Sequence, residues 1–192
     1  FREIRHTMTQ IRIAWVRGQL EQREGDDGAA ARAFERALAL ATRTGFREAE
    51  AGIAGALARA RLRQGDHAGA LEIARRGIAR LLPDEAWSRS RGRVLAWAPG
   101  IALLVATLAE LGEGPRAMAF LDAHRRRLEQ PELPLAQHAV LCAIARAELL
   151  TGRTARGERS LRDAWRVAGK ASLAHRAPEL DDALRTTRQA SR

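Results

Sequence analysis

A phrase of seventeen residues that begins with glycine occurs four times in this chain of 192 residues, and it limits the possible folds more than any other feature. The copies begin at Gly25, Gly65, Gly112 and Gly152, so their starts lie 40, 47 and 40 residues apart. A period in this range is typical of stacked helical repeats, in which each unit buries its apolar face against its neighbours. The repeat therefore predicts one continuous array over residues 1–192 instead of several globular domains.

Each copy reads as the second helix of a helix–turn–helix unit. Around Phe34, apolar residues recur at spacings of three and four, which marks one buried helical face. Gly25 and Gly65 can adopt the left-handed backbone that ends a helix, and Asp26 and Asp66 can cap the helix that follows. No alternating run bounded by turn residues is present, so we expect no strands. We predict an all-α fold with units over about 11–45, 47–82, 84–129 and 134–172, and a capping helix over about 177–190.

Small residues stand where the two helices of a unit must approach each other. The residues that fit this pattern are Gly18, Ala30 and Ala37 with the large Phe34 in the first unit, and Ala58, Ala70, Ala74 and Gly77 in the second. With this pattern the chain resembles the tetratricopeptide repeats over about residues 11–168. The resemblance implies a right-handed α-solenoid whose first helices line a concave groove. Because the period exceeds the roughly 34 residues of the standard repeat, the chain looks more like the longer repeats of multidomain bacterial regulators, and a HEAT-like or other α-solenoid is the alternative.

In proteins of that family the groove holds a peptide or a partner's helix. Carried over to this sequence, the candidate partner-binding residues are Trp15, Gln19, Gln22, Arg23, Arg59, Arg63 and Arg146, and the third unit offers Ala102, Ala106 and Glu110. Arg59 and Arg63 lie four residues apart on one helix face, and guanidinium groups bind carboxylates or phosphates with paired hydrogen bonds. These two arginines therefore predict a local anion site, with a solvated helix face as the alternative. We expect a scaffold or sensor module that binds a peptide or another domain within a larger bacterial signalling protein.

The net charge of +10 raises nucleic-acid binding as a second hypothesis. All basic residues except Lys170 are arginine, which points to genomic base composition as the source of the excess. The run of arginines over 125–127 falls near an expected helix C-terminus, where positive charge is favourable. Tyrosine is absent and no nucleic-acid recognition motif is present. A protein partner is therefore the preferred hypothesis.

The sequence contains few residues that could carry catalysis. Phosphate-binding loops, HExxH, paired CxxC and GxSxG motifs are absent. Cys142 is the single cysteine, which excludes an internal disulfide and, without a recognisable signal sequence, indicates the cytoplasm. It follows His138 by four residues, so a thiol–imidazole pair can form, although a lone cysteine on such a helix is usually a small buried hydrophobe. The other histidines lack metal-ligand spacing. We expect no enzyme, no cofactor and no metal.

The third unit departs from the regular period. Residues from Val94 to Ala109 are uncharged, but the run is too short for a membrane span and contains Pro99 and Gly100. We expect a helix enclosed by its neighbours, with a kink or an additional short helix within residues 84–111. Dimerisation or an interdomain contact through the third unit is the alternative. Because the chain begins at Phe1 and not at methionine, we also expect it to be a segment of a longer protein.

Overall fold

The computed structural model describes residues 2–81, 91–129 and 133–170, and every regular element within these ranges is an α-helix. The side chains of residues 2–5 and 91–96 are not described. The helices are α1 (Arg2–Glu24), α2 (Asp27–Thr44), α3 (Arg47–Arg63), α4 (His67–Leu81), α6 (Arg91–Glu110), α7 (Gly114–Leu128), α8 (Pro134–Leu150) and α9 (Thr154–Lys170). The prediction of an all-α fold is confirmed. The predicted capping helix over 177–190 lies outside the described residues.

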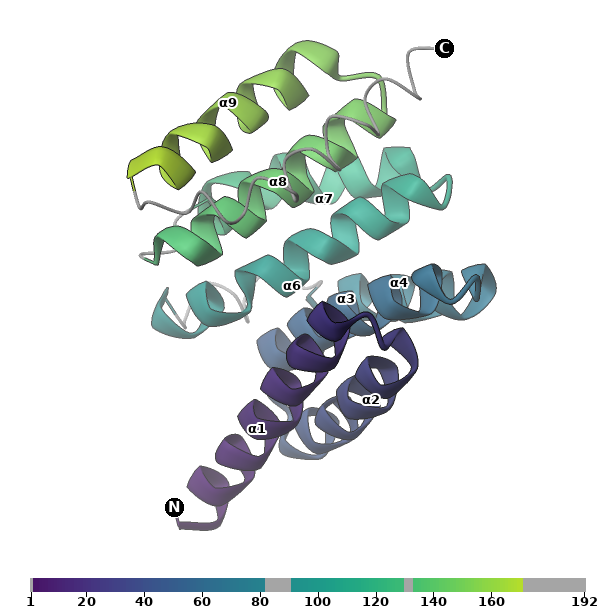
Figure 1. Ribbon diagram of the computed structural model, residues 1–192, viewed down its shortest axis with the longest axis vertical. Coiled ribbons are helices and arrows are strands. Elements are labelled where there is room, and N and C mark those ends of the chain that lie inside the picture. Colours follow the sequence, from purple (N-terminus) through teal and green to yellow (C-terminus); the bar gives the residue numbers. More distant parts are fainter. Residues whose placement is uncertain (1, 82–90, 130–132, 171–192) are drawn as a thin grey trace.

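Helix pairs are stacked in chain order along the long axis of the molecule (Figure 1). The pairs are α1 with α2, α3 with α4, α6 with α7, and α8 with α9. Between pairs, α2 packs against α3, α3 packs against α6, and α6 packs against α8. The first helices of the last three pairs therefore form a continuous layer, and residues from α3, α6 and α8 can meet on one surface.

Several helices end at a glycine whose backbone is in the left-handed conformation, and the chain turns there into the next helix. Gly25 has a φ of 87° and donates its N–H to the carbonyl of Gln22, while Asp26 donates to the carbonyl of Glu21 at 3.0 Å. This pair of bonds satisfies carbonyls that the helix end leaves free. Asp26 then accepts the N–H of Ala29 at 2.7 Å and caps α2, as predicted. The same backbone conformation recurs at Gly45, Gly65, Gly112 and Gly152.

The first pair is packed around Phe34, which is fully buried. A Cβ built on Gly18 would lie 2.5 Å from Cε1 of Phe34, well inside van der Waals contact. Only glycine therefore leaves room for the ring against α1. The predicted small residue in the first helix and large residue in the second are confirmed for this unit.

The uncharged stretch of the third unit forms most of α6 and is enclosed, as predicted. Ile101, Leu104 and Leu108 are fully buried, and α3, α4, α7 and α8 all pack against this helix. Pro99 lies inside α6, and the expected extra or kinked segment before residue 91 lies partly outside the described residues. Among the described residues, no helix has the length and apolar character needed to span a membrane.

A buried ionic network holds the last two pairs together. Glu148 of α8 is fully buried and accepts a hydrogen bond from Nη1 of Arg125 in α7 at 2.5 Å. The hydroxyl of Ser160 in α9 donates to the same carboxylate at 2.9 Å and accepts from Arg125 at 2.8 Å. Arg125 does lie in the last turn of α7, as predicted, but Glu148 and Glu129 bind its guanidinium. Burial alone would lower the pKa of Arg125, yet the bonds and charges of these two carboxylates raise it.

Candidate partner-binding site

Two of the predicted site arginines converge on one carboxylate. Arg59 of α3 donates to Oε2 of Glu110 in α6 at 2.5 Å. Arg146 of α8 donates to Oε2 at 3.2 Å and to Oε1 of the same residue at 3.1 Å. One residue from each of three first helices therefore meets at a single point, which we call the arginine cluster (Arg59, Glu110 and Arg146).

The side chains of the arginine cluster are partly buried. The exposed fractions of the side chains are 13% for Arg59, 27% for Glu110 and 16% for Arg146. Burial lowers the pKa of Arg59, the neighbouring Arg146 and Arg63 lower it further, and Glu110 opposes both effects. The carboxylate of Glu110 thus holds two guanidinium groups from different helices in partly buried surroundings.

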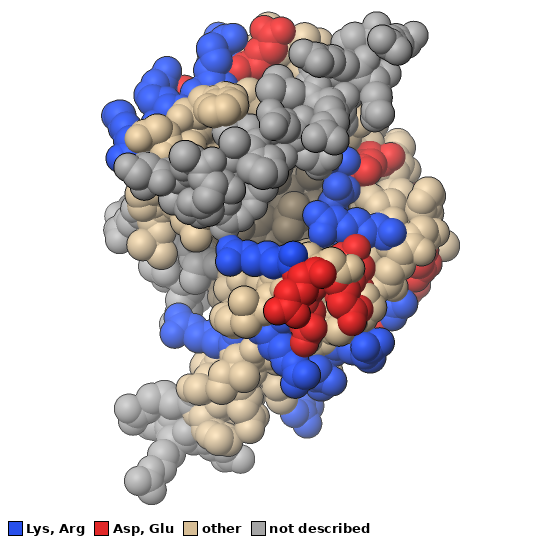
Figure 2. Space-filling model, viewed as in Figure 1, with Lys and Arg blue, Asp and Glu red and all other residues tan. Residues whose placement is uncertain are grey.

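Arg63 lies one turn beyond Arg59 on α3, at the edge of the cluster. Its Nη1 lies 3.5 Å from Oδ1 of Asp27, and the neighbouring Gln64 donates to the carbonyl of Asp27 at 2.5 Å. Figure 2 shows acidic side chains gathered where α1 ends and α2 begins, with basic side chains beside them. The acidic residues of this segment are Glu21, Glu24, Asp26 and Asp27. The basic surface of α3 is therefore bordered by an acidic one.

The predicted site residues of α1 have different surroundings. Trp15 packs against Trp97 of α6, with ring centroids 5.0 Å apart and the planes tilted by 60°. Gln19 and Gln22 are half-buried, and Arg23 is exposed. Trp15 thus joins α1 to α6 by apolar packing, and no described hydrogen bond or ion pair links these α1 side chains to the arginine cluster.

Sequence reasoning placed Arg59, Arg146 and Glu110 on the same surface but did not foresee that they bind one another. The available signal for this pairing was the opposite sign of the charges on neighbouring first helices, with arginine in α3 and α8 and glutamate in α6 between them. Glu110 lies one turn beyond Ala106, which is the residue of α6 that corresponds to Arg59 and Arg146, so pairing across the layer was possible.

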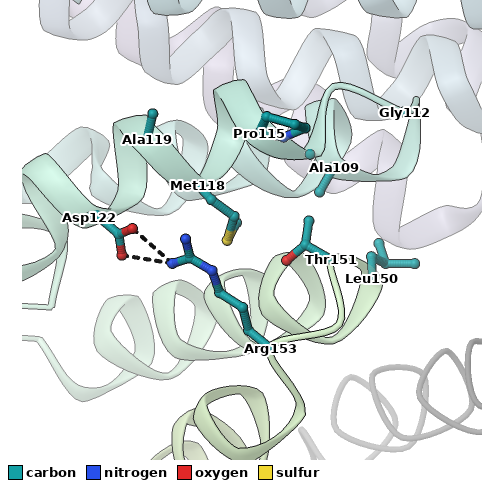
Figure 3. A pocket seen from close by; sticks show the side chains of 10 residues that line it. Ala109, Gly112, Pro115, Met118, Ala119, Asp122, Leu150, Thr151 and Arg153 are labelled. Carbon is teal, nitrogen blue, oxygen red and sulfur yellow. Dashed lines mark hydrogen bonds and ion pairs between the residues drawn. The ribbon is translucent and has the colours of Figure 1, made fainter.

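A second concave region, not predicted, lies between the turn after α6 and the turn after α8 (Figure 3). This open cleft of about 610 Å³ has Met118 and Asp122 on one side and Thr151 and Arg153 on the other. Arg153 reaches across and donates to both oxygens of Asp122 at 2.8 and 2.9 Å, and Arg156 donates to Oδ1 at 3.2 Å. The recurrence of the glycine turns was the available signal, because stacked pairs bring successive turns to one edge.

The predicted alternative of a thiol–imidazole pair has poor geometry. Sγ of Cys142 lies 3.9 Å from Nδ1 and 3.8 Å from Nε2 of His138, so it is not aligned with either ring N–H. His138 is fully buried, and its Nδ1 lies 3.4 Å from the carbonyl oxygen of Ala164. Over the described ranges, no group of three or more His, Cys, Asp or Glu side chains is arranged to hold a metal ion.

Known proteins supply no further assignment. Comparison with protein-family models, with curated proteins and with solved structures finds no match.

Proposed function

We propose that this chain is a tetratricopeptide-like solenoid that binds an acidic peptide segment on the surface formed by α3, α6 and α8. The segment belongs to a partner protein or to another domain of a larger regulatory protein. The arginine cluster carries this proposal, because two partly buried guanidinium groups from α3 and α8 converge on the carboxylate of Glu110, on the surface that the three first helices form.

The chemistry of the cluster favours a carboxylate ligand. A guanidinium binds a carboxylate through two parallel N–H donors, and such charge-assisted bonds gain strength where water is partly excluded. Arg59 and Arg146 have most of their side chains buried, so an arriving carboxylate meets donors that are already positioned. Glu110 holds both arginines in place before the ligand arrives, which reduces the entropy lost on binding.

Nucleic-acid binding has weaker support. Binding of nucleic acid requires arginines whose guanidinium groups are free to reach its phosphate backbone. Carboxylates from other parts of the stack bind Arg61, Arg75, Arg80, Arg125 and Arg153. These arginines join parts of the stack to one another, so they are not free to contact a nucleic-acid backbone.

Fluorescence anisotropy with two labelled peptides tests the proposal. One is a twelve-residue peptide with glutamate at alternate positions, and the other carries glutamine at those positions. We expect the glutamate peptide to bind more tightly. Arg146→Gln should weaken its binding about tenfold, the loss expected for one charge-assisted hydrogen bond. Glu110→Gln should strengthen it several-fold, because the side-chain carbonyl of glutamine can still hold the two guanidinium groups while the competing negative charge is removed.

Arg76→Gln is the matched control, since Arg76 is an exposed arginine of α4 that pairs with Glu72 on its own helix. It should leave the affinity unchanged. Equal affinity for both peptides, or no response to Glu110→Gln and Arg146→Gln, would overturn the proposal. Tighter binding of a labelled single-stranded DNA through the same arginines would favour the nucleic-acid hypothesis instead.

A further inference from the structure

One face of α1 exposes a row of large apolar side chains. The exposed fractions are 64% for Ile13, 46% for Val16 and 52% for Leu20. Their spacing of three and four residues places them on one stripe of the helix. We call this row the α1 stripe (Ile13, Val16 and Leu20). An exposed stripe of this kind marks a contact surface, while isolated exposed apolar residues do not.

The recurring sequence phrase shows what the same positions do in the later pairs. Counted from the glycine that ends each first helix, the α1 stripe corresponds to Ile53, Ala56 and Ala60 in α3 and to Val140, Ala143 and Ala147 in α8. All six of these residues are at most 6% exposed. The equivalent of Ile13 in α6 is Gly100, and a Cβ on it would overlap the backbone of Gly52 in α3. This register is therefore buried in α3 and α8, and in α6 it faces the preceding helix pair.

In α3 the preceding element that packs on this side is α2. Gly52 and Gly55 turn toward α6, and Ala54 lies beside Gly77 of α4, so the remaining apolar face, with Ile53, meets α2. Ion pairs flank that contact: Arg61 binds Glu35 of α2, and Arg63 lies beside Asp27.

The charges next to the α1 stripe follow the same register. Glu21 stands where α3 has Arg61, and Arg23 stands where α3 has Arg63. Arg23 is exposed, and no described ion pair involves it. A helix that covers the stripe as α2 covers α3 would therefore place an acid in its first turn near Arg23 and a base, at the position of Glu35, near Glu21.

We propose that the α1 stripe is an open stacking face that binds the second helix of a further helix pair. This helix has small apolar residues on its docking side, an acidic residue in its first turn and a basic residue eight positions later. A second copy of this chain fits poorly, because α9 carries Glu158 where α2 carries the buried Ala31. The inference concerns a different surface from the arginine cluster and does not depend on the proposed function.

A tandem variant tests this inference directly. It consists of residues 1–46 followed by residues 7–192, so that an added α2 precedes the original α1 with the natural Gly45–Phe46 turn between them. Glu35→Lys in the added copy supplies the base opposite Glu21. In a stacked array each new interface adds to stability. We therefore expect a single unfolding transition with Tm raised by at least about 3 °C.

Val16→Glu separates stacking from a local effect of the added residues. In the natural chain it should leave Tm nearly unchanged, because Val16 is half exposed and surface changes have small effects. In the original α1 of the tandem variant it should abolish the gain. A tandem variant without Glu35→Lys should gain less.

Three results would overturn the proposal. The tandem variant could melt in two separate transitions, or its Tm could equal that of the natural chain. Val16→Glu could lower the Tm of both chains equally. A concentration-dependent doubling of the mass of the natural chain in light scattering, removed by Val16→Glu, would assign the stripe to a second copy.

Discussion

Gly55 of α3 and Gly100 of α6 lie in backbone contact. A Cβ on Gly55 would overlap the carbonyl oxygen of Gly100, and a Cβ on Gly100 would overlap the carbonyl of Gly52. Two helices can approach this closely only where both lack side chains at the crossing. The crossing fixes α3 against α6, and so it sets the distance over which Arg59 can reach Glu110.

Gly55→Ala should therefore destabilise the protein. The new methyl group meets backbone atoms that cannot move aside, and such overpacking costs about 1–3 kcal/mol. This cost exceeds the gain of up to about 1 kcal/mol that alanine brings to a helix interior. The measurement is the free energy of unfolding in urea.

Gly169→Ala is the matched control for that experiment. Gly169 also lies in a helix, α9, but a Cβ there meets no atom within 4 Å. This substitution should be neutral or slightly stabilising. If Gly55→Ala were as stable as Gly169→Ala, the close backbone contact between α3 and α6 would not explain why glycine stands at position 55.

Gly18 and Phe34 should be energetically coupled. Phe34→Ala removes a fully buried ring and should cost about 3–5 kcal/mol, whereas Gly18→Ala forces a methyl group into that ring. In the double variant the methyl group enters the space that the ring has left. The double variant should thus lose less stability than the sum of the single variants, by on the order of 1 kcal/mol. Strictly additive losses in a double-mutant cycle would contradict this packing.

Local signals predicted the fold well, and pairing across the stack was harder to predict. The turn at Gly25, the cap by Asp26 and the wedge at Phe34 depend on residues close in sequence or on a simple period, and all three are found. The pairing of Arg59 and Arg146 with Glu110 joins residues 51 and 36 positions apart. The period alone does not show which charges meet, because that depends on how closely the helices cross.

Glu148→Gln should destabilise the last two pairs more than an exposed change does. Arg125 and Ser160 both bind this fully buried carboxylate, and breaking a buried ion pair leaves its partner without compensation. We expect a loss of about 3 kcal/mol in the free energy of unfolding. Glu158→Gln removes an exposed partner of Arg162 on α9 and should cost less than about 0.5 kcal/mol. If Glu148→Gln lowered the free energy of unfolding as little as Glu158→Gln does, Glu129 alone would be sufficient to hold Arg125.

Asp122 should make the stability of the protein depend on pH in acid. The hydrogen bond from Arg153, helped by the charges of Arg153 and Arg156, lowers the pKa of Asp122 below its ordinary value of 3.8 although burial opposes the shift. The folded state therefore holds the proton less tightly than the unfolded state does. The contribution is fully present above the ordinary aspartate pKa and is lost as the pH falls through the lowered value. The stability gap between the natural chain and Asp122→Asn should stay constant from neutral pH to about pH 5 and narrow below about pH 4.

Arg153→Gln provides the independent check on the cause of that dependence. Without the principal hydrogen bond, the pKa of Asp122 should rise toward its ordinary value, which NMR titration of its carboxyl carbon measures directly. The variant should also show a weaker loss of stability in acid than the natural chain. Since Arg156 still lies beside Asp122, part of the lowering should remain, and removal of both arginines should abolish it. An Asp122 titration curve that does not move in Arg153→Gln would show that the bonds drawn across the cleft in Figure 3 do not hold in solution.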